Sequence, residues 1–278
     1  MILEVGLNKK YAMISQAVNA ARDGDEILIY SGWYDDILFC DKELTFTGVP
    51  SNKNDYSTYP VICNPPESFS CFWSKCKAYN LVFTATESLN PKDLNILMMQ
   101  KENDSVTENA SLEKICQKYR DCIKENYAFV LRAGGSFENC IFFGSSKSGV
   151  AVMTDPQTER CTFSKCGFFF NGETVSENYG YTDGGSAISC LYPEVAQIVM
   201  IDECLFKYNE KGIESRGQAC FIIRKSFITC CQSSPLVAAA DSLIIIEESE
   251  IVNNSKDISF YENAEVIATA CRLRGRRI

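Results

Sequence analysis

Glu214 and Arg216 are the strongest candidates for catalysis in this sequence. One position separates them, so in a strand their side chains lie on the same face. They are candidates only under the alternative that this chain is an enzyme. The structural alternative is a surface ion pair, which contributes little to stability. Glycoside hydrolysis or Ca²⁺ binding needs convergent carboxylates, and this segment supplies one.

The 278 residues include no histidine. Imidazole is the commonest general base and the commonest metal ligand, so its absence excludes catalytic triads and metal sites built on it. Fifteen cysteines are present without a Cys-x-x-Cys pair; Cys71 and Cys76, like Cys161 and Cys166, are five positions apart. Zinc sites usually use tighter pairs. We therefore expect no metal and no cofactor, while catalysis by Asp, Glu, Arg, Lys, Tyr or Cys stays open.

Tyr179, Tyr181 and Asp183 form the best candidate contact site. They lie in segment 171–185, which is rich in Gly, Asn, Asp and Tyr, a composition typical of a loop. Exposed aromatic side chains suit sugar binding, and they also anchor protein interfaces. The same two interpretations apply to Trp33, Tyr34 and Trp73, although Trp33 and Tyr34 fall in a turn near the N-terminus that we expect to be structural.

The overall composition indicates a globular, cytoplasmic protein. A net charge of -9 disfavours nucleic acid as a partner, because tracking phosphates needs a cationic surface. Residues 1–6 lack the features of a secretory signal, and no segment approaches the ~20 apolar residues of a membrane helix. We expect reduced thiols and no membrane association. The basic cluster Arg272, Arg274, Arg276 and Arg277 is expected to be a solvated tail rather than a docking site.

A weak internal repeat runs through the second half of the chain. A small Cys or Ser follows two mostly polar residues, usually with a bulky apolar residue two positions later. The repeated slot is predicted at Cys140, Cys161, Cys204, Ser226, Ser249 and Cys271, with gaps of 21, 43, 22, 23 and 22 residues. The gap of 43 is one repeat plus the loop 171–185. Periods of 20 to 50 residues signal a solenoid.

Three short apolar strands recur within each repeat, which predicts a solenoid coil. A coil cannot bury its own apolar face, so coils must stack about 4.8 Å apart and pair their strands. The fold class is therefore all-β, a right-handed single-stranded parallel β-helix forming one domain over 1–278, with its most regular coils at 137–273. Stacked coils place like positions in ladders, so we expect the Cys and Ser slot to be a core ladder rather than a set of reactive thiols.

Two helical segments accompany the coils. Residues 11–22 carry a helical apolar stripe ended by Gly24, and residues 86–126 interrupt the repeat with apolar positions at helical spacing. The first is expected to cap the open end of the solenoid, which would otherwise be an exposed sheet edge. The second is interpreted as an inserted helical hairpin that packs on the solenoid wall; the alternative is a docking arm.

The opening of the chain resembles a known family. The order Ile14, Gln16-Ala-Val-Asn-Ala-Ala21, Gly24-Asp25, Ile27-Leu-Ile29, Gly32-x-Tyr34, Asp41-Lys42 and Leu44-x-x-x-Gly48 is similar to the start of pectin-lyase-fold proteins. These include pectinesterases and the intracellular CASH β-helix repeats of F-box and SHC-binding proteins. The resemblance covers residues 1–50 well and the rest only as repeat rhythm. It implies the fold and a capping role for the helix, and says little about chemistry.

The catalytic motifs of these enzymes have no counterpart here. If the resemblance extended to activity, a pectinesterase would carry a signature with two aspartates, a Gln and an Arg, and a polygalacturonase would carry a pattern that includes a His. Neither motif is present in this sequence. On the second strand of each coil, the usual catalytic face, Ala151, Glu214, Val237 and Ser259 are expected to point outward. Only one of these four is acidic.

We therefore favour a non-catalytic intracellular scaffold that binds protein partners through its wall, for example in a cytoskeletal or signalling assembly. The alternative is a polysaccharide-binding or polysaccharide-degrading β-helix, similar to uronate lyases or esterases. An enzyme requires a cleft with convergent Asp, Arg or Lys on one wall. A scaffold requires an exposed apolar or aromatic strip.

Overall fold

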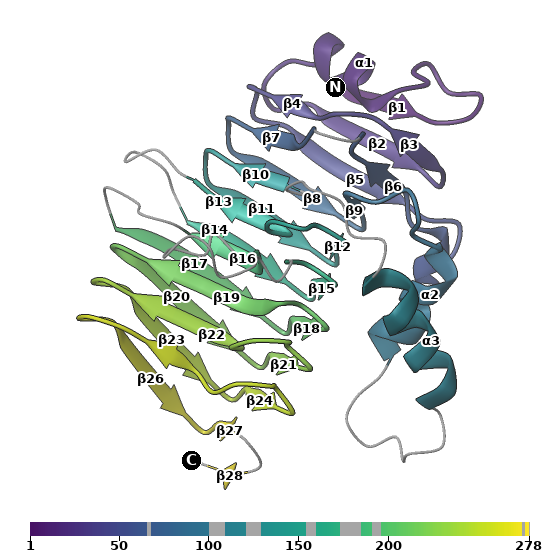
Figure 1. The fold of residues 1–278 in the computed structure, drawn as a ribbon. Helices are drawn as coiled ribbons and strands as arrows, with labels where there is room; N and C mark the ends of the chain where they lie inside the picture. The colour runs from purple at the N-terminus through teal and green to yellow at the C-terminus, as the bar shows by residue number, and fades with distance from the viewer. Residues whose placement is uncertain are drawn as a thin grey trace.

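The computed structural model describes residues 1–65, 68–99, 109–120, 129–153, 160–172, 185–190, 196–273 and 276–277. Three sheets run along one axis, and each coil of the chain adds one strand to each sheet (Figure 1). All strand pairs are parallel except the last, β27 with β28. The prediction of an all-β parallel β-helix is confirmed.

Sheet A contains β1 (Ile2–Val5), β2 (Glu26–Tyr30), β5 (Thr45–Val49), β8 (Cys76–Tyr79), β11 (Gly135–Glu138), β14 (Cys161–Ser164), β17 (Gln197–Asp202), β20 (Ala219–Arg224), β23 (Leu243–Glu247) and β26 (Glu265–Thr269). Sheet B contains β3 (Trp33–Asp35), β6 (Val61–Cys63), β9 (Val82–Thr84), β12 (Ile141–Phe143), β15 (Gly167–Phe169), β18 (Leu205–Lys207), β21 (Phe227–Thr229), β24 (Glu250–Val252), β27 (Arg272–Leu273) and β28 (Arg276–Arg277). Sheet C contains β4 (Phe39–Cys40), β7 (Ser70–Phe72), β10 (Phe129–Leu131), β13 (Val150–Val152), β16 (Ser186–Cys190), β19 (Lys211–Arg216), β22 (Leu236–Ala239) and β25 (Ser259–Phe260).

Stacking of like residues fills the interior. Because the coils are in register, an inward side chain lies directly over its counterpart in the next coil. The rings of Phe142 and Phe168 stack with their centroids 5.0 Å apart, and those of Phe168 and Phe206 stack at 4.6 Å. These spacings match the strand separation in a sheet, about 4.8 Å. The aromatic stack therefore helps to hold the coil register.

A single residue in the left-handed conformation makes the bend from sheet A to sheet B. These residues are Asn80, Asn139, Lys165, Glu203, Lys225, Glu248 and Ala270, with φ between 45° and 56°. This conformation is disfavoured for residues with a Cβ. In the regular coils the bend residue donates its N–H to a carbonyl of the next coil, as Glu203 does to Arg224 at 3.0 Å. The next coil thus helps to stabilise every bend except the last, Ala270.

A small slot residue follows every bend except Asn80, which is followed by Leu81. The thiol or hydroxyl of the slot residue donates to the carbonyl two residues earlier, and at Cys166, Cys204 and Ser226 the N–H donates to the slot side chain of the next coil. For example, Ser226 Oγ donates to Arg224 O at 2.7 Å and accepts from Cys204 N at 3.0 Å. The row consists of Cys140, Cys166, Cys204, Ser226, Ser249 and Cys271, and all six are buried.

Cys161 does not belong to this row, so that part of the predicted ladder is wrong. Cys161 lies inside β14, opposite Gly135 and Val199. Cys166 occupies the slot instead, one residue after the bend at Lys165, with its N–H 3.4 Å from Cys204 Sγ. Both cysteines follow two mostly polar residues, and the sequence comparison selected the wrong one. The remaining five predicted positions lie in the row.

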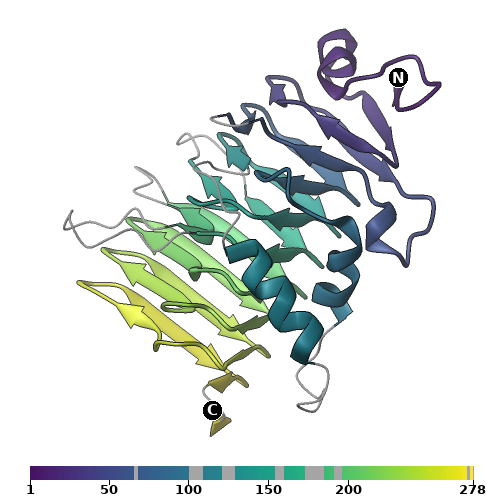
Figure 2. The same cartoon turned by 45° about the vertical axis from the view of Figure 1, so that its right-hand side comes forward.

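The helices lie at one end and on one side of the solenoid (Figure 2). Helix α1 (Ile14–Ala20) falls within the predicted segment 11–22 and lies at the N-terminal end, where Lys42 Nζ donates to Val18 O at 2.8 Å. A 3-10 helix, η1 (Tyr56–Thr58), and the helices α2 (Pro91–Met99) and α3 (Asn109–Arg120) lie beside sheet B. Both α2 and α3 fall within the predicted insertion 86–126.

The insertion packs on the wall, as its apolar spacing indicated. Leu94 and Leu97 of α2 and Ile115 and Tyr119 of α3 form one buried cluster with outward residues of sheet B, including Phe143. Burial of such a helical stripe is the ordinary way to remove it from water. Among the described residues, no helix is long and apolar enough to cross a membrane.

The slot ladder can be tested by comparing Ser226→Ala with Ser226→Cys. Alanine leaves the buried N–H of Cys204 without its acceptor, and we expect a loss of about 1–3 kcal/mol in the free energy of unfolding. Cysteine, which fills this slot in other coils, should cost less than half as much. Urea denaturation of both variants measures the difference, and equal losses would contradict a hydrogen-bonding role for the slot.

Candidate functional site

The outer face of sheet C collects the side chains best suited to bind a ligand. Its first outward row is Phe39, Cys71, Val130, Ala151, Ser189, Glu214, Val237 and Ser259, as the strand register shows. All of these except Phe39 and Ser259 are buried. The second row, two residues further along each strand, includes Trp73, Arg132, Met153, Arg216 and Ala239. The predicted outward positions Ala151, Glu214, Val237 and Ser259 all lie in the first row.

Glu214 is buried and held by two cations. Its side chain is only 3% exposed; Oε2 lies 3.1 Å from Lys211 Nζ, and Oε1 lies 2.6 Å from an Arg216 guanidinium nitrogen. Arg216 Nε donates to the same Oε1 at 2.9 Å. The expectation of a weak surface ion pair is therefore wrong. Both carboxylate oxygens of Glu214 are occupied, so the cluster is suited to holding the two cations in place.

Trp73 and Arg132 form an exposed pair at the other end of the same face. Arg132 Cζ lies 5.4 Å from the centre of the Trp73 ring, within the range of a cation–π contact. The Trp73 side chain is 57% exposed, and Arg132 is also exposed. Among the residues that the structure describes, no carboxylate pairs with Arg132. The pair thus offers a flat apolar surface beside an available guanidinium.

Two further exposed aromatic side chains extend this surface. Phe39 is 56% exposed and Phe69 is 38% exposed, and their rings meet edge to face with centroids 6.3 Å apart. Phe39 pairs in register with Cys71, two residues before Trp73. Burial raises the pKa of the Cys71 thiol to about 11, although the Arg132 guanidinium acts in the opposite direction. Cys71 therefore stays protonated at neutral pH, and the surface acts through aromatic and cationic groups.

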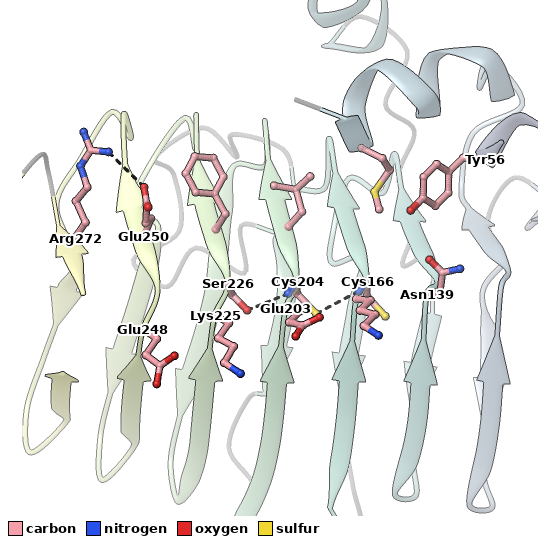
Figure 3. Close-up of a pocket in the computed structure, with 14 residues that line it drawn as sticks. Tyr56, Asn139, Cys166, Glu203, Cys204, Lys225, Ser226, Glu248, Glu250 and Arg272 are labelled. Carbon is pink, nitrogen blue, oxygen red and sulfur yellow. Dashed lines mark hydrogen bonds and ion pairs between the residues drawn. The ribbon is translucent and has the colours of Figure 1, made fainter. Parts of the chain in front are cut away.

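A groove of about 880 Å³ runs along the bend between sheets A and B (Figure 3). It is lined by Tyr56, Met98, Asn139, Lys165, Cys166, Glu203, Cys204, Leu205, Lys225, Ser226, Phe227, Glu248, Glu250 and Arg272. Lysine and glutamate alternate along the bend residues from Lys165 to Glu248, and Glu250 pairs with Arg272 at 3.4 Å. Three cations and three carboxylates line the groove, so it has no net charge that would attract a charged ligand.

The contact site predicted at Tyr179, Tyr181 and Asp183 lies outside the described residues. Sequence reasoning proposed Glu214 and Arg216, which the structure brings together, and missed Lys211 and Arg132. Arg132 follows Val130 by two positions, as Arg216 follows Glu214, so an alignment of the sheet C strands could have found it. Among the described residues, no three Cys, Asp or Glu side chains gather in a way that could hold a metal ion.

Comparison with known proteins places the fold. No family model matches the chain, and no curated protein sequence does. Pectin methylesterase PemA from Erwinia chrysanthemi superimposes with a TM-score of 0.50 at 12% identity, over 99% of this chain and 90% of that enzyme. A pectin methylesterase from Aspergillus niger superimposes with a TM-score of 0.44 at 14% identity, over 96% of this chain and 85% of that enzyme. The chain has the pectin lyase-like right-handed parallel β-helix fold.

The buried charge cluster can be tested with Glu214→Gln against Glu250→Gln. Glutamine at position 214 removes the carboxylate that two largely enclosed cations share, and breaking such a cluster costs about 3–5 kcal/mol. The Glu250–Arg272 pair is exposed, and its loss should cost less than about 1 kcal/mol. Urea denaturation at neutral pH measures both. Equal costs would show that Glu214 is not the structural counter-ion described here.

Proposed function

We propose that the outer face of sheet C binds an acidic polysaccharide, with Trp73 and Arg132 as its centre. The observation that carries this proposal is the exposed tryptophan ring with a guanidinium beside it and no described carboxylate paired to that guanidinium. An aromatic ring offers a flat apolar surface to the face of a sugar ring. The guanidinium can form a bidentate, charge-assisted pair with a sugar carboxylate.

The geometry of the face suits a polymer. Its outward rows run along the solenoid axis, and Arg132 and Arg216 lie in the same row, three strand spacings apart, about 14 Å. At the far end, Arg216 shares the Glu214 carboxylate with Lys211. Between the two arginines, the described part of this row contains Met153, which is partly exposed. Arg132 is therefore the group that would meet a sugar carboxylate, and the row gives the polymer its direction.

The proposal is one of binding rather than of cleavage. Glycoside hydrolysis uses two carboxyl groups about 5–10 Å apart. In the two described rows, the carboxylates are Glu214 and Asp41, the residue after β4. They are five strand spacings apart, about 24 Å, and Glu214 is enclosed by its two cations. PemA is by its name a pectin methylesterase, but similarity at 12% identity concerns the fold, so support for this ligand class comes from the residues of the face.

The two tryptophans allow a direct test. Trp33 lies on sheet B and Trp73 on sheet C, so Trp33→Phe leaves Trp73 as the sole indole. Titration of this variant with oligogalacturonate should change its fluorescence saturably, because a sugar ring covers the indole. The added variant Arg132→Ala should weaken binding about tenfold or more, as expected when a charge-assisted hydrogen bond is lost. Added salt should weaken binding as well.

The matched controls use the same residue types on other faces. The variant Trp73→Phe retains Trp33 and should show no fluorescence change, and Arg224→Ala on sheet A should bind normally. A neutral glucan should not compete. Equal responses from Trp33 and Trp73, or unchanged affinity in Arg132→Ala, would contradict the proposed site.

A second candidate function is the protein-binding scaffold expected from the sequence. The observation that favours it is a partly exposed aliphatic strip on the outer face of sheet A, formed by Met200, Ile222, Ile245 and Ile267. Exposed apolar patches on soluble proteins commonly mark interaction sites. The roles in cytoskeletal or signalling assemblies and the cytoplasmic location remain predictions of the sequence.

A further inference from the structure

The outer face of sheet A changes character half-way along the solenoid. On the first coils its central outward row is polar: Thr45, Lys77, Ser136 and Thr162. On the last four coils the same row is aliphatic: Met200, Ile222, Ile245 and Ile267. The row beside it continues the apolar area with Ile198, Cys220 and Leu243. Six of these seven side chains are partly exposed, and Ile267 is 48% exposed.

The described helices do not cover this area. Helix α1 lies at the N-terminal end, and α2 and α3 lie against sheet B (Figure 1, Figure 2). Strands β17 and β20 have six residues each, so the area is long as well as flat. Flat apolar sheet faces pack on one another about 10 Å apart in sandwich folds. The area is therefore suited to a second sheet.

A row of charged side chains beside this apolar area indicates which sheet could pack against it. The third outward row contains Asp202, Arg224, Glu247 and Thr269 on successive coils. Consider two copies of the chain related by a two-fold axis that is parallel to the strands and passes midway between β20 and β23. Each outward row of one copy then faces the same row of the other copy, with the order of the coils reversed. This axis places Arg224 opposite Glu247 of the second copy, and Glu247 opposite that copy's Arg224. The same axis places Ile222 opposite Ile245.

The same axis sets the other pairs. Cys220 faces Leu243, Asp202 faces Thr269, and Ile198 faces Glu265 at the outer edge of the area, so no like charges meet. Arg224 Nε lies 2.6 Å from Glu247 Oε2 within one chain, and the two side chains are 47% and 39% exposed. In the paired arrangement they would join a network of four alternating charges. An isologous interface requires this kind of self-complementarity.

We propose that two copies of the chain pair face to face through β17, β20, β23 and β26 of sheet A. The proposal deepens the second candidate function, whose interaction surface it uses, and is independent of glycan binding on sheet C. Four strands of five or six residues present about 400 Å² per copy, which is about half of the roughly 800 Å² per partner in a standard interface. We therefore expect a weak, reversible dimer.

A charge-swap experiment tests the pairing. Arg224→Glu places four carboxylates at the centre of a self-paired interface, and Glu247→Arg places four guanidinium groups there. Each variant alone should sediment as a monomer at concentrations where the unmodified protein forms dimers. An equimolar mixture should form heterodimers, because carboxylates of one variant then face guanidinium groups of the other. Analytical ultracentrifugation with one variant fluorescently labelled measures all three samples.

Two controls keep folding and function separate from pairing. Leu28→Lys changes an outward residue of sheet A on the first coils and should leave the dimer intact. Both charge variants should keep the oligogalacturonate response of Trp73, which reports a folded sheet C face. A monomeric unmodified protein, or a mixture of variants that stays monomeric, would overturn the proposal. Capture of a different protein by this face, with no self-association, would overturn it too while supporting a scaffold.

Discussion

The fold depends on a one-residue bend that a single coil cannot stabilise. Residues such as Lys165, Glu203 and Lys225 adopt the left-handed conformation despite carrying a Cβ. The cost is offset by hydrogen bonds to the next coil and by the small slot residue that follows, whose thiol or hydroxyl closes the turn. Each coil thus supplies part of the stability of the one before it. This nearest-neighbour dependence is characteristic of solenoids.

Regular stacking has a direct consequence for the surface. Once coils are in register, outward side chains form straight rows, and each of the three sheets presents its own rows to solvent. Sheet B is partly covered by α2 and α3, sheet C carries the aromatic and cationic rows, and sheet A carries the aliphatic rows. A straight row of side chains can contact an extended partner along its whole length, and a polymer chain or a second flat sheet is such a partner. The two proposed interactions use different walls and can coexist.

Much of this organisation could be predicted from the sequence, because repeated patterns report stacking. The alternation of apolar residues, the small slot and the helical stripes of the capping and inserted segments all reflect burial on one face. The mistake at Cys161 arose because two cysteines five residues apart satisfy the same local pattern, and only the coil register selects Cys166. Local spacing carries no information on which of two equivalent residues meets the next coil.

The candidate site was less predictable, for the same physical reason. Glu214 and Arg216 are close in sequence and were identified, but their burial and the contribution of Lys211 depend on the surroundings of β19. Trp73 and Arg132 are 59 positions apart, and the insertion between them hides the fact that they occupy adjacent coils. Tyr179, Tyr181 and Asp183 remain a prediction, because they lie outside the described residues.

The most direct test of the central claim is a crystal structure of the protein with a short oligogalacturonate. We expect a sugar ring over the indole of Trp73 and a sugar carboxylate within hydrogen-bond distance of the Arg132 guanidinium, with the oligosaccharide running along the outward row toward Arg216. An oligosaccharide bound in the groove between sheets A and B, or on a face without Trp73 and Arg132, would contradict this claim.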